Sequence, residues 1–154
     1  MSETPAPPRP TDAELLARFQ RSTNRPRGSQ LLGFEIVAVD QAAMRVEATF
    51  VAREDFMNPM RQVQGGFLCA MLDDVMSVAG VVASGMTHVM PTLEMKTSFL
   101  RPALPGQTLR CVGRVVKWGR TIAFTEGEIY DEAGALLAKA TGTALPTPFA
   151  RFKG

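Results

Sequence analysis

One stretch of the chain, residues 64–85, constrains the fold more than any other. The glycine pair Gly65-Gly66 opens it, Gly85 closes it, and nearly every side chain between them is apolar. An apolar run that ends in a glycine suited to a left-handed C-cap is typical of a helix. Because a surface helix shows only one apolar stripe, a helix that is apolar on all sides is expected to be buried on all sides. The other segments must therefore wrap around it.

Two adjacent acids, Asp73 and Asp74, are the only charged residues inside this run. An ionised carboxylate is costly in apolar surroundings unless it is paired or hydrogen-bonded, so both acids are candidates for function. Successive residues of a helix point about 100° apart. One acid can therefore enter a site while the other is solvated or pairs with an arginine. Helical spacing does not choose between them, and a structural role such as capping a loop stays open.

The bulk composition argues against several classes of protein. The 154 residues suit one domain, the net charge is +2, and there is no basic run, so neither nucleic acid nor a membrane is an expected partner. The apolar run is interrupted by its two acids and is not expected to span a membrane. Pro, Arg and Glu fill the first 14 positions, which does not suit a signal peptide, and we expect a cytoplasmic protein.

Candidate metal ligands and nucleophiles are few. Cys69 and Cys111 are far apart in the sequence and are expected to be reduced core thiols. The single histidine, His88, follows the apolar run and is expected in a loop or on the surface. No metal, cofactor or Ser-His-Asp triad is therefore predicted.

Before the apolar run, the sequence predicts a leader and one short helix. Residues 1–10 hold four prolines and no apolar periodicity, which predicts a disordered leader. Thr11 followed by Glu14 is typical of a capping box, so a helix is expected from Asp12 to about Arg21. The polar, basic stretch Ser22–Ser29 is predicted to be a loop.

Alternating apolar and polar residues predict antiparallel strands on both sides of the run. Two strands before it are expected to form a hairpin with a tight connection at Gln41-Ala42, followed by an irregular segment. Turn residues separate four strands after it, which are expected to pair in sequence order as a meander. The six strands are Phe34–Asp40, Ala43–Val51, Met90–Leu100, Thr108–Trp118, Thr121–Tyr130 and Ala135–Ala144.

A six-stranded sheet curled around one buried helix accounts for this order and places the chain in the α+β class. Residues 11–148 would form a single domain, and residues 149–154 a tail that frays after Pro146 and Pro148. Such a sheet covers only part of the helix. The uncovered side is expected to meet the same face of a second subunit.

A set of motifs in this order resembles a known family. From about Leu32 to Leu145, the chain resembles the hotdog-fold acyl-CoA thioesterases of the phenylacetic-acid-degradation (PaaI-like) type. That resemblance implies a curved antiparallel sheet of about six strands around one long central helix. The motifs are Asn58, Gln64-Gly65-Gly66, Asp73, Thr92-Leu93-Glu94-Met95, Phe99-Leu100-Arg101-Pro102-Ala103 with Gly106, and Val115-Val116-Lys117-Trp118-Gly119-Arg120.

The resemblance also implies an activity, the hydrolysis of an acyl-CoA thioester to the free acid and CoA. Asp73 takes the place of the family's acid, which is a nucleophile or a general base for water. Gly65 takes the place where a backbone N–H polarises the thioester carbonyl, and Asn58 that of an amide that helps to position the thioester or water. Thr92 matches a hydroxyl near the acid in some members, whereas others carry it one helical turn later, here at Ser77.

One position departs from the family pattern. Many members have histidine where this chain has Gln64, so a proton transfer from that side chain is lost and only a contact that an amide can make is kept. CoA would be part of the substrate. The cationic side chains among its expected binding residues suit phosphate, although they can equally be ordinary solvated charges. Phe99 can equally be a core residue. The expected binding residues are Gly66, Phe99, Arg101, Pro102, Lys117 and Arg120.

The spacing of two candidates predicts a shared site. Gly65 and Asp73 are eight residues apart, which is about 12 Å along a helix, too far for both to contact one thioester. If both act, Gly65 of one subunit faces the partner subunit's Asp73 across an antiparallel helix pair. A homodimer with two equivalent sites follows, and the family suggests a dimer of dimers.

Two other functions stay open. A hotdog dehydratase or hydratase depends on an Asp/His pair, and its histidine is absent from the motif here. A non-catalytic protein that binds acyl-CoA or fatty acids is disfavoured by the joint presence of Asn58, Gly65 and Asp73. Release of free thiol discriminates among the three, because only hydrolysis produces it.

Overall fold

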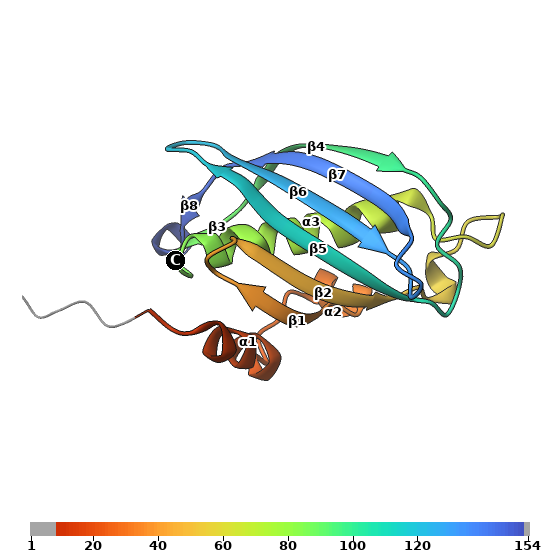
Figure 1. The fold of residues 1–154 in the computed structure, drawn as a ribbon, viewed down its shortest axis with the longest axis horizontal. Helices are drawn as coiled ribbons and strands as arrows, with labels where there is room; N and C mark the ends of the chain where they lie inside the picture. Colours follow the sequence, from red (N-terminus) through yellow and green to blue (C-terminus); the bar gives the residue numbers. More distant parts are fainter. Residues whose placement is uncertain (1–8, 153–154) are drawn as a thin grey trace, which may run out of the picture.

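A six-stranded antiparallel sheet curves around one long helix, α3 (Gly65–Ala83), as Figure 1 shows. The structure, a computed structural model, describes residues 9–152. Most of the predicted disordered leader lies outside the described residues. The α+β hotdog architecture expected from the sequence is confirmed, with α3 close to its predicted limits and Gly85 in the left-handed region at φ 67°.

Helices come before and between the strands in the chain, and together they form one unit of sheet and helix layers. They are α1 (Asp12–Arg21), α2 (Arg27–Leu32), β1 (Glu35–Asp40), β2 (Arg45–Val51), the 3-10 turn η1 (Glu54–Phe56), α3, β3 (His88–Val89), β4 (Thr92–Phe99), β5 (Thr108–Trp118), β6 (Ala123–Tyr130), β7 (Leu136–Ala144), β8 (Thr147–Pro148) and the 3-10 turn η2 (Phe149–Phe152).

The strand order of the large sheet is β1-β2-β5-β6-β7-β4. The predicted meander is correct for β5, β6 and β7, but β4 pairs with β7 rather than with β5. The segment after β4 crosses the start of α3, where the Val63 N–H donates to the Ala103 carbonyl over 2.9 Å. As a result, β4 forms one edge of the sheet, at the far end from β1.

Glycines in the sheet allow α3 to approach it closely. A Cβ at Gly113 of β5 would collide with the carbonyl oxygen of Val75, and Cβ atoms at Gly127 and Gly142 would press on Met76. Only glycine fits where backbone and helix meet at this distance. The buried residues of α3 are Leu68, Met71, Leu72, Val75, Met76, Ala79, Gly80 and Val82.

By length and composition alone, α3 could cross a membrane. The fold gives another reason for its apolar character, because α3 packs against β2, β5 and β6 and forms the centre of the main hydrophobic core. A core helix and a membrane span satisfy the same composition test, and only the surroundings separate them.

The N-terminal segment contains one confirmed helix and one that the sequence did not predict. Glu14 accepts a 2.7 Å hydrogen bond from the Thr11 N–H, and its own N–H donates to the Thr11 hydroxyl, so the capping box is present. The loop predicted over Ser22–Ser29 is wrong at its end, because α2 begins at Arg27 and stops before Gly33 at φ 73°. Six residues are too few to show a clear apolar period.

Two strand boundaries also differ from the prediction. The tight connection at Gln41-Ala42 is wrong: β1 and β2 are joined by a turn over residues 41–44, with Met44 at φ 50°. The strand predicted over Met90–Leu100 begins only at Thr92. Its first part is interrupted at Pro91, which has no N–H to contribute to a ladder.

A second, two-stranded sheet forms where the sequence predicted a loop and a frayed tail. β3 contains His88, and it pairs with Thr147–Pro148 of β8. The His88 ring is half-buried and meets the edge of Trp118, with 5.9 Å between ring centroids. The expectations of a loop at His88 and of no regular structure after Pro146 are therefore wrong.

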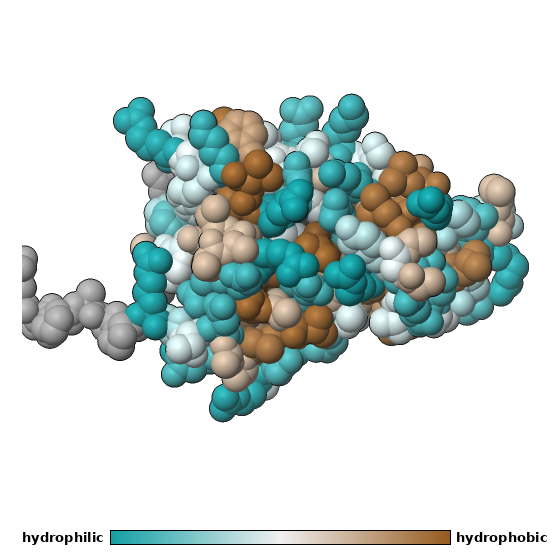
Figure 2. Space-filling view, viewed as in Figure 1, coloured by the Kyte–Doolittle hydropathy of each residue, from teal (hydrophilic) through white to brown (hydrophobic). Residues whose placement is uncertain are grey.

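The outer face of the large sheet is polar in many places. Arg110 pairs with Glu47 at 3.2 Å and Lys139 with Glu128 at 3.5 Å. Figure 2, viewed as Figure 1, shows hydrophilic residues interspersed with separate hydrophobic patches. The core therefore lies on the concave face, around α3, and the candidate site is built there.

Candidate active site

Asp73 lies in the middle of α3 and reaches the edge strand β4. The hydroxyl of Thr92, the first residue of β4, donates a 2.6 Å hydrogen bond to Asp73 Oδ1. Short hydrogen bonds to an ionised carboxylate are strong, so Thr92 holds this group in one orientation. Asp73 is half-buried and Thr92 is exposed in the isolated chain, which leaves the carboxylate open to a substrate.

Ser77, the alternative hydroxyl, does not contact Asp73 in this way. Within residues 9–152, its hydroxyl makes neither a hydrogen bond to Asp73 nor one back to a helix carbonyl. Thr92, on a strand that is distant in sequence, is the hydroxyl beside the acid.

The first turn of α3 offers two free backbone N–H groups. The carbonyl of Gln64, the N-cap residue, accepts from the Phe67 N–H over 2.9 Å, and the exposed Gln64 side chain makes no capping bond. The N–H groups of Gly65 and Gly66 have no acceptor in the described part of the chain. Free N–H groups at the positive end of a helix dipole suit a developing negative charge, so this turn can polarise a carbonyl oxygen.

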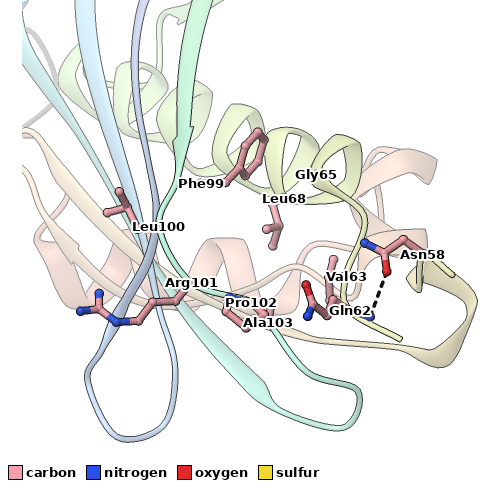
Figure 3. Close-up of a pocket in the computed structure, with 10 residues that line it drawn as sticks. All are labelled: Asn58, Gln62, Val63, Gly65, Leu68, Phe99, Leu100, Arg101, Pro102 and Ala103. Atoms are coloured by element: carbon pink, nitrogen blue, oxygen red, sulfur yellow. Dashed lines mark hydrogen bonds between the residues drawn. The ribbon is translucent and has the colours of Figure 1, made fainter. Parts of the chain in front are cut away.

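A cleft of about 360 Å³ lies beside this turn, and we call it the Gly65 cleft. Its lining comes from three segments, the loop before α3, the first turns of α3, and the chain after β4, as Figure 3 shows. A Cβ at Gly65 would lie 3.0 Å from Cζ of Phe99. The Phe99 ring thus packs against the helix backbone and forms a wall of the cleft; it is 54% exposed, so it is not a core residue.

Asn58 contributes to the Gly65 cleft from a rigid loop. Its side-chain oxygen accepts hydrogen bonds from the N–H groups of Met60, at 2.9 Å, and Gln62, at 3.2 Å. These bonds hold the turn that carries Asn58, and the side chain lines the cleft. The Asn58 amide can therefore contact a thioester or a water molecule in the cleft.

Arg101 and Pro102 also reach the Gly65 cleft. Arg101 Nη1 donates 2.8 Å to the Leu136 carbonyl, and Figure 3 shows the guanidinium extending away from the Gly65 turn. The guanidinium keeps other N–H donors, so a phosphate bound by Arg101 would lie on the side away from the Gly65 turn.

The other two expected phosphate ligands lie elsewhere in the chain. Lys117 and Arg120 are exposed at the β5–β6 hairpin. Trp118, between them, packs on His88, which follows the C-terminal end of α3. Within one chain, the hairpin therefore lies at the end of α3 opposite to Gly65, and the structure does not bring these cations to the Gly65 cleft.

Asp74 has surroundings that the sequence did not predict. It is half-buried, and no arginine pairs with it among the described residues: Asp74 Oδ1 accepts a 3.1 Å hydrogen bond from the Ser29 hydroxyl, and Oδ2 is buried without a partner there. Burial raises the pKa of Asp74 above its ordinary range, the Ser29 bond lowers it, and the charge of Asp73 raises it. Forty-five positions separate Ser29 from Asp74, so no local pattern could indicate this contact.

The two thiols have different surroundings. Burial raises the pKa of the Cys111 thiol strongly, which keeps it protonated. Cys69 is only half-buried, against the expectation of a core position, and its sulfur lies 3.5 Å from the Thr97 hydroxyl. Among residues 9–152, no group of three His, Cys, Asp or Glu side chains is placed to hold a metal ion.

Comparison with known proteins identifies the family of this chain. Residues 62–138, half of the chain, match the family model described as Thioesterase superfamily. F42H10.6 of Caenorhabditis elegans, provisionally named an esterase, is 30% identical over 92% of this chain and 86% of its own length. Human acyl-coenzyme A thioesterase 13 is 25% identical over 84% of this chain and 90% of its own length.

Solved structures show the same fold. A phenylacetic acid degradation-related protein from Ralstonia eutropha JMP134 is 38% identical, with a TM-score of 0.78 over 84% of this chain and 98% of that chain. PaaI of Escherichia coli is 21% identical, with a TM-score of 0.70 over 77% of this chain and 87% of that chain. The chain therefore belongs to the thioesterase superfamily, as a hotdog-fold protein similar to PaaI.

Proposed function

We propose that this protein hydrolyses an acyl-CoA thioester, with Asp73 as the reacting carboxylate. The observation that carries the proposal is that the same helix holds an oriented, accessible carboxylate and, at its first turn, free N–H groups. Membership of the thioesterase superfamily supports hydrolysis of a thioester. CoA as the thiol is supported by the name of the human relative and by a Streptococcus mutans protein of this fold, solved bound to acetyl CoA.

The chemistry needs two events at one carbonyl. In the general-base route, Asp73 takes a proton from water while the water oxygen bonds to the carbonyl carbon. In the nucleophilic route, an Asp73 oxygen bonds to that carbon and water later cleaves the anhydride. Both routes place negative charge on the former carbonyl oxygen, which the Gly65 N–H stabilises. The C–S bond then breaks, and the CoA sulfur leaves as a thiolate that takes up a proton.

One chain does not bring these two groups to the same carbonyl. Gly65 and Asp73 are eight residues apart on α3, about 12 Å along its axis. We therefore place the site between two subunits, with Gly65 of one facing the partner subunit's Asp73.

The edge strand β4 supports this dimer. Leu93 and Phe99 of β4 are 55% and 54% exposed, and Leu100, directly after it, is 52% exposed. An unpaired strand edge of this length favours pairing with another chain. Because β4 also carries Thr92, pairing of two β4 strands would bring two α3 helices, and both Asp73 carboxylates, to the interface. A further association of two dimers is proposed only by analogy with the family.

A mixing experiment tests the shared site. The Asp73→Asn variant and the Gly65→Pro variant should each release little CoA from an acyl-CoA panel. Proline suits this first helical position and removes the N–H, and Gln64 already has φ −61° and ψ 137°, which a following proline accepts. In mixed dimers, one of the two sites keeps both groups, so co-refolding equal amounts should recover about a quarter of the wild-type rate.

Two controls complete this experiment. Gly65→Ala places a methyl group against Phe99 but keeps the N–H, so it separates crowding from the loss of the donor. A mixture that stays as inactive as its components would overturn the shared site. No thiol release by the wild-type protein from any acyl-CoA would overturn the thioesterase proposal in favour of a binding protein or a dehydratase.

A further inference from the structure

A second cleft, which we call the Asp74 cleft, lies along the flank of α3 that carries Asp74. Its volume is about 390 Å³, and its walls come from α3, the segment containing α1 and α2, residues 34–36, residues 86–90 and Phe149. Most of its walls are apolar, including Phe19, Phe34, Ile36, Val78 and Val81. A concave, mainly apolar space with a few polar groups is the usual form of a small-molecule site.

The polar groups of the Asp74 cleft are incompletely satisfied. Asp74 Oδ2 is buried without a hydrogen-bond partner, and the Ser77 hydroxyl makes no bond in the described part of the chain. A buried carboxylate oxygen without a partner is rare, because leaving it unpaired costs free energy. Asp74 lines the cleft, and because the terminal torsion of aspartate is broad, a ligand in the cleft can pair with this oxygen after rotation of the carboxylate.

The Asp74 cleft lies close to the reacting carboxylate. Ser77, in its wall, follows Asp73 by four residues, and side chains at this spacing are about 5–6 Å apart on a helix. An acyl group whose carbonyl is held at Asp73 therefore reaches the cleft within a few carbon atoms.

We propose that the Asp74 cleft receives the acyl group of the thioester and that Asp74 selects acyl groups that carry a hydroxyl. The apolar walls accommodate the methylene carbons. The hydroxyl can both donate and accept, so it satisfies Asp74 whether the carboxyl is ionised or protonated. The inference rests on the proposed function, but its test does not require hydrolysis.

Binding of two thioethers tests the inference. S-hexyl-CoA and S-(6-hydroxyhexyl)-CoA cannot be hydrolysed, and they differ only in the hydroxyl. Their dissociation constants are measured by calorimetry for the wild-type protein and for Asp74→Leu. We expect the wild-type protein to prefer S-(6-hydroxyhexyl)-CoA over S-hexyl-CoA. In Asp74→Leu this preference, the ratio of the two dissociation constants, should fall about tenfold, since one hydrogen bond of ordinary strength is lost. If Asp74→Leu does not fold, Asp74→Ala gives the same comparison.

Hydrolysis supplies the second readout. The kcat/KM for 6-hydroxyhexanoyl-CoA divided by that for hexanoyl-CoA should also fall when Asp74 is replaced by leucine. An unchanged ratio of dissociation constants, or thioethers that bind no tighter than CoA itself, would overturn the role of Asp74 and of its cleft. Selective thioether binding without thiol release would leave that role standing and overturn only the thioesterase function.

Discussion

Two carboxylates that are adjacent in the sequence occupy opposite surroundings in the fold. Asp73 faces β4 at the edge of the sheet, where the Thr92 hydroxyl donates to it and where it is open to substrate. Asp74 faces α2, where Ser29 donates to one oxygen and the other is buried without a partner. The pair shows that a turn of 100° along a helix is enough to give two adjacent carboxylates different neighbours.

The difference has a structural cause. One flank of α3 meets an edge strand, and an edge strand leaves room for another subunit or a ligand. The flank next to it meets the α1–α2 segment, which partly buries Asp74 within the same chain. Each of the following predictions changes one side of this comparison.

The largest effect is expected on the Asp73 side. Asp73→Asn keeps the shape of the side chain but removes its ability to accept a proton or attack a carbonyl, so kcat for CoA release should fall about 10³-fold. A thiol-detecting assay measures this. Asp40→Asn is the matched control, because Asp40 only accepts the Ala43 N–H in the β1–β2 turn. A fully active Asp73→Asn would remove Asp73 from the mechanism.

A smaller effect is expected from the group that orients Asp73. Thr92→Val keeps the volume of the side chain but removes the 2.6 Å hydrogen bond, and kcat should fall about tenfold, in keeping with a bond to a charged group. The control is Thr141→Val, at an exposed position of β7. Equal rates for the two variants would show that Thr92 does not position the acid.

On the Asp74 side, the first expected effect is on stability. Ser29→Ala removes the donor to Asp74 Oδ1, so a second oxygen of a half-buried carboxylate loses its partner. The free energy of unfolding in urea should fall by about 1 kcal/mol at neutral pH. Ser98→Ala, at an exposed position of β4, should change it much less. Equal losses would mean that the Ser29–Asp74 bond does not hold α2 to α3.

The smallest effect is a pH dependence. Burial raises the pKa of Asp74 in the folded protein, so the folded state binds the Asp74 proton more tightly than the unfolded state does. Asp74 therefore contributes less to the free energy of unfolding as the pH rises through that pKa. Asn does not titrate. The unfolding free energy of Asp74→Asn minus that of wild type should therefore increase from about pH 4 to about pH 8. A difference that is flat with pH would show that Asp74 is solvated when folded.

The sequence predicts some elements well because their signals are local. The all-apolar run with glycine at both ends places α3, and the alternation of residues places β5 at its observed limits. The capping box at Thr11 is equally local and is also confirmed. Turn signals, however, say that a strand ends and not where the next strand goes, which is why β4 was expected beside β5 although it pairs with β7.

The candidate site divides in the same way. A motif spacing could single out Asp73 and Gly65, but the contact of Thr92 with Asp73 spans nineteen positions and that of Ser29 with Asp74 spans forty-five. The separation of Lys117 and Arg120 from the Gly65 cleft depends on the path of the β5–β6 hairpin. None of these relations has a pattern along the chain.

The amino-acid sequence by itself determined that a long apolar helix with two central acids must be enclosed by a sheet, because burial of so much apolar surface is the main source of stability. It also determined that the two acids point in different directions. Only the tertiary structure decided which neighbour each acid meets, and therefore which is accessible and which is desolvated. Hydrogen bonds, burial and pKa depend on atoms brought together from distant parts of the chain, and those distances are set by the path of the whole backbone.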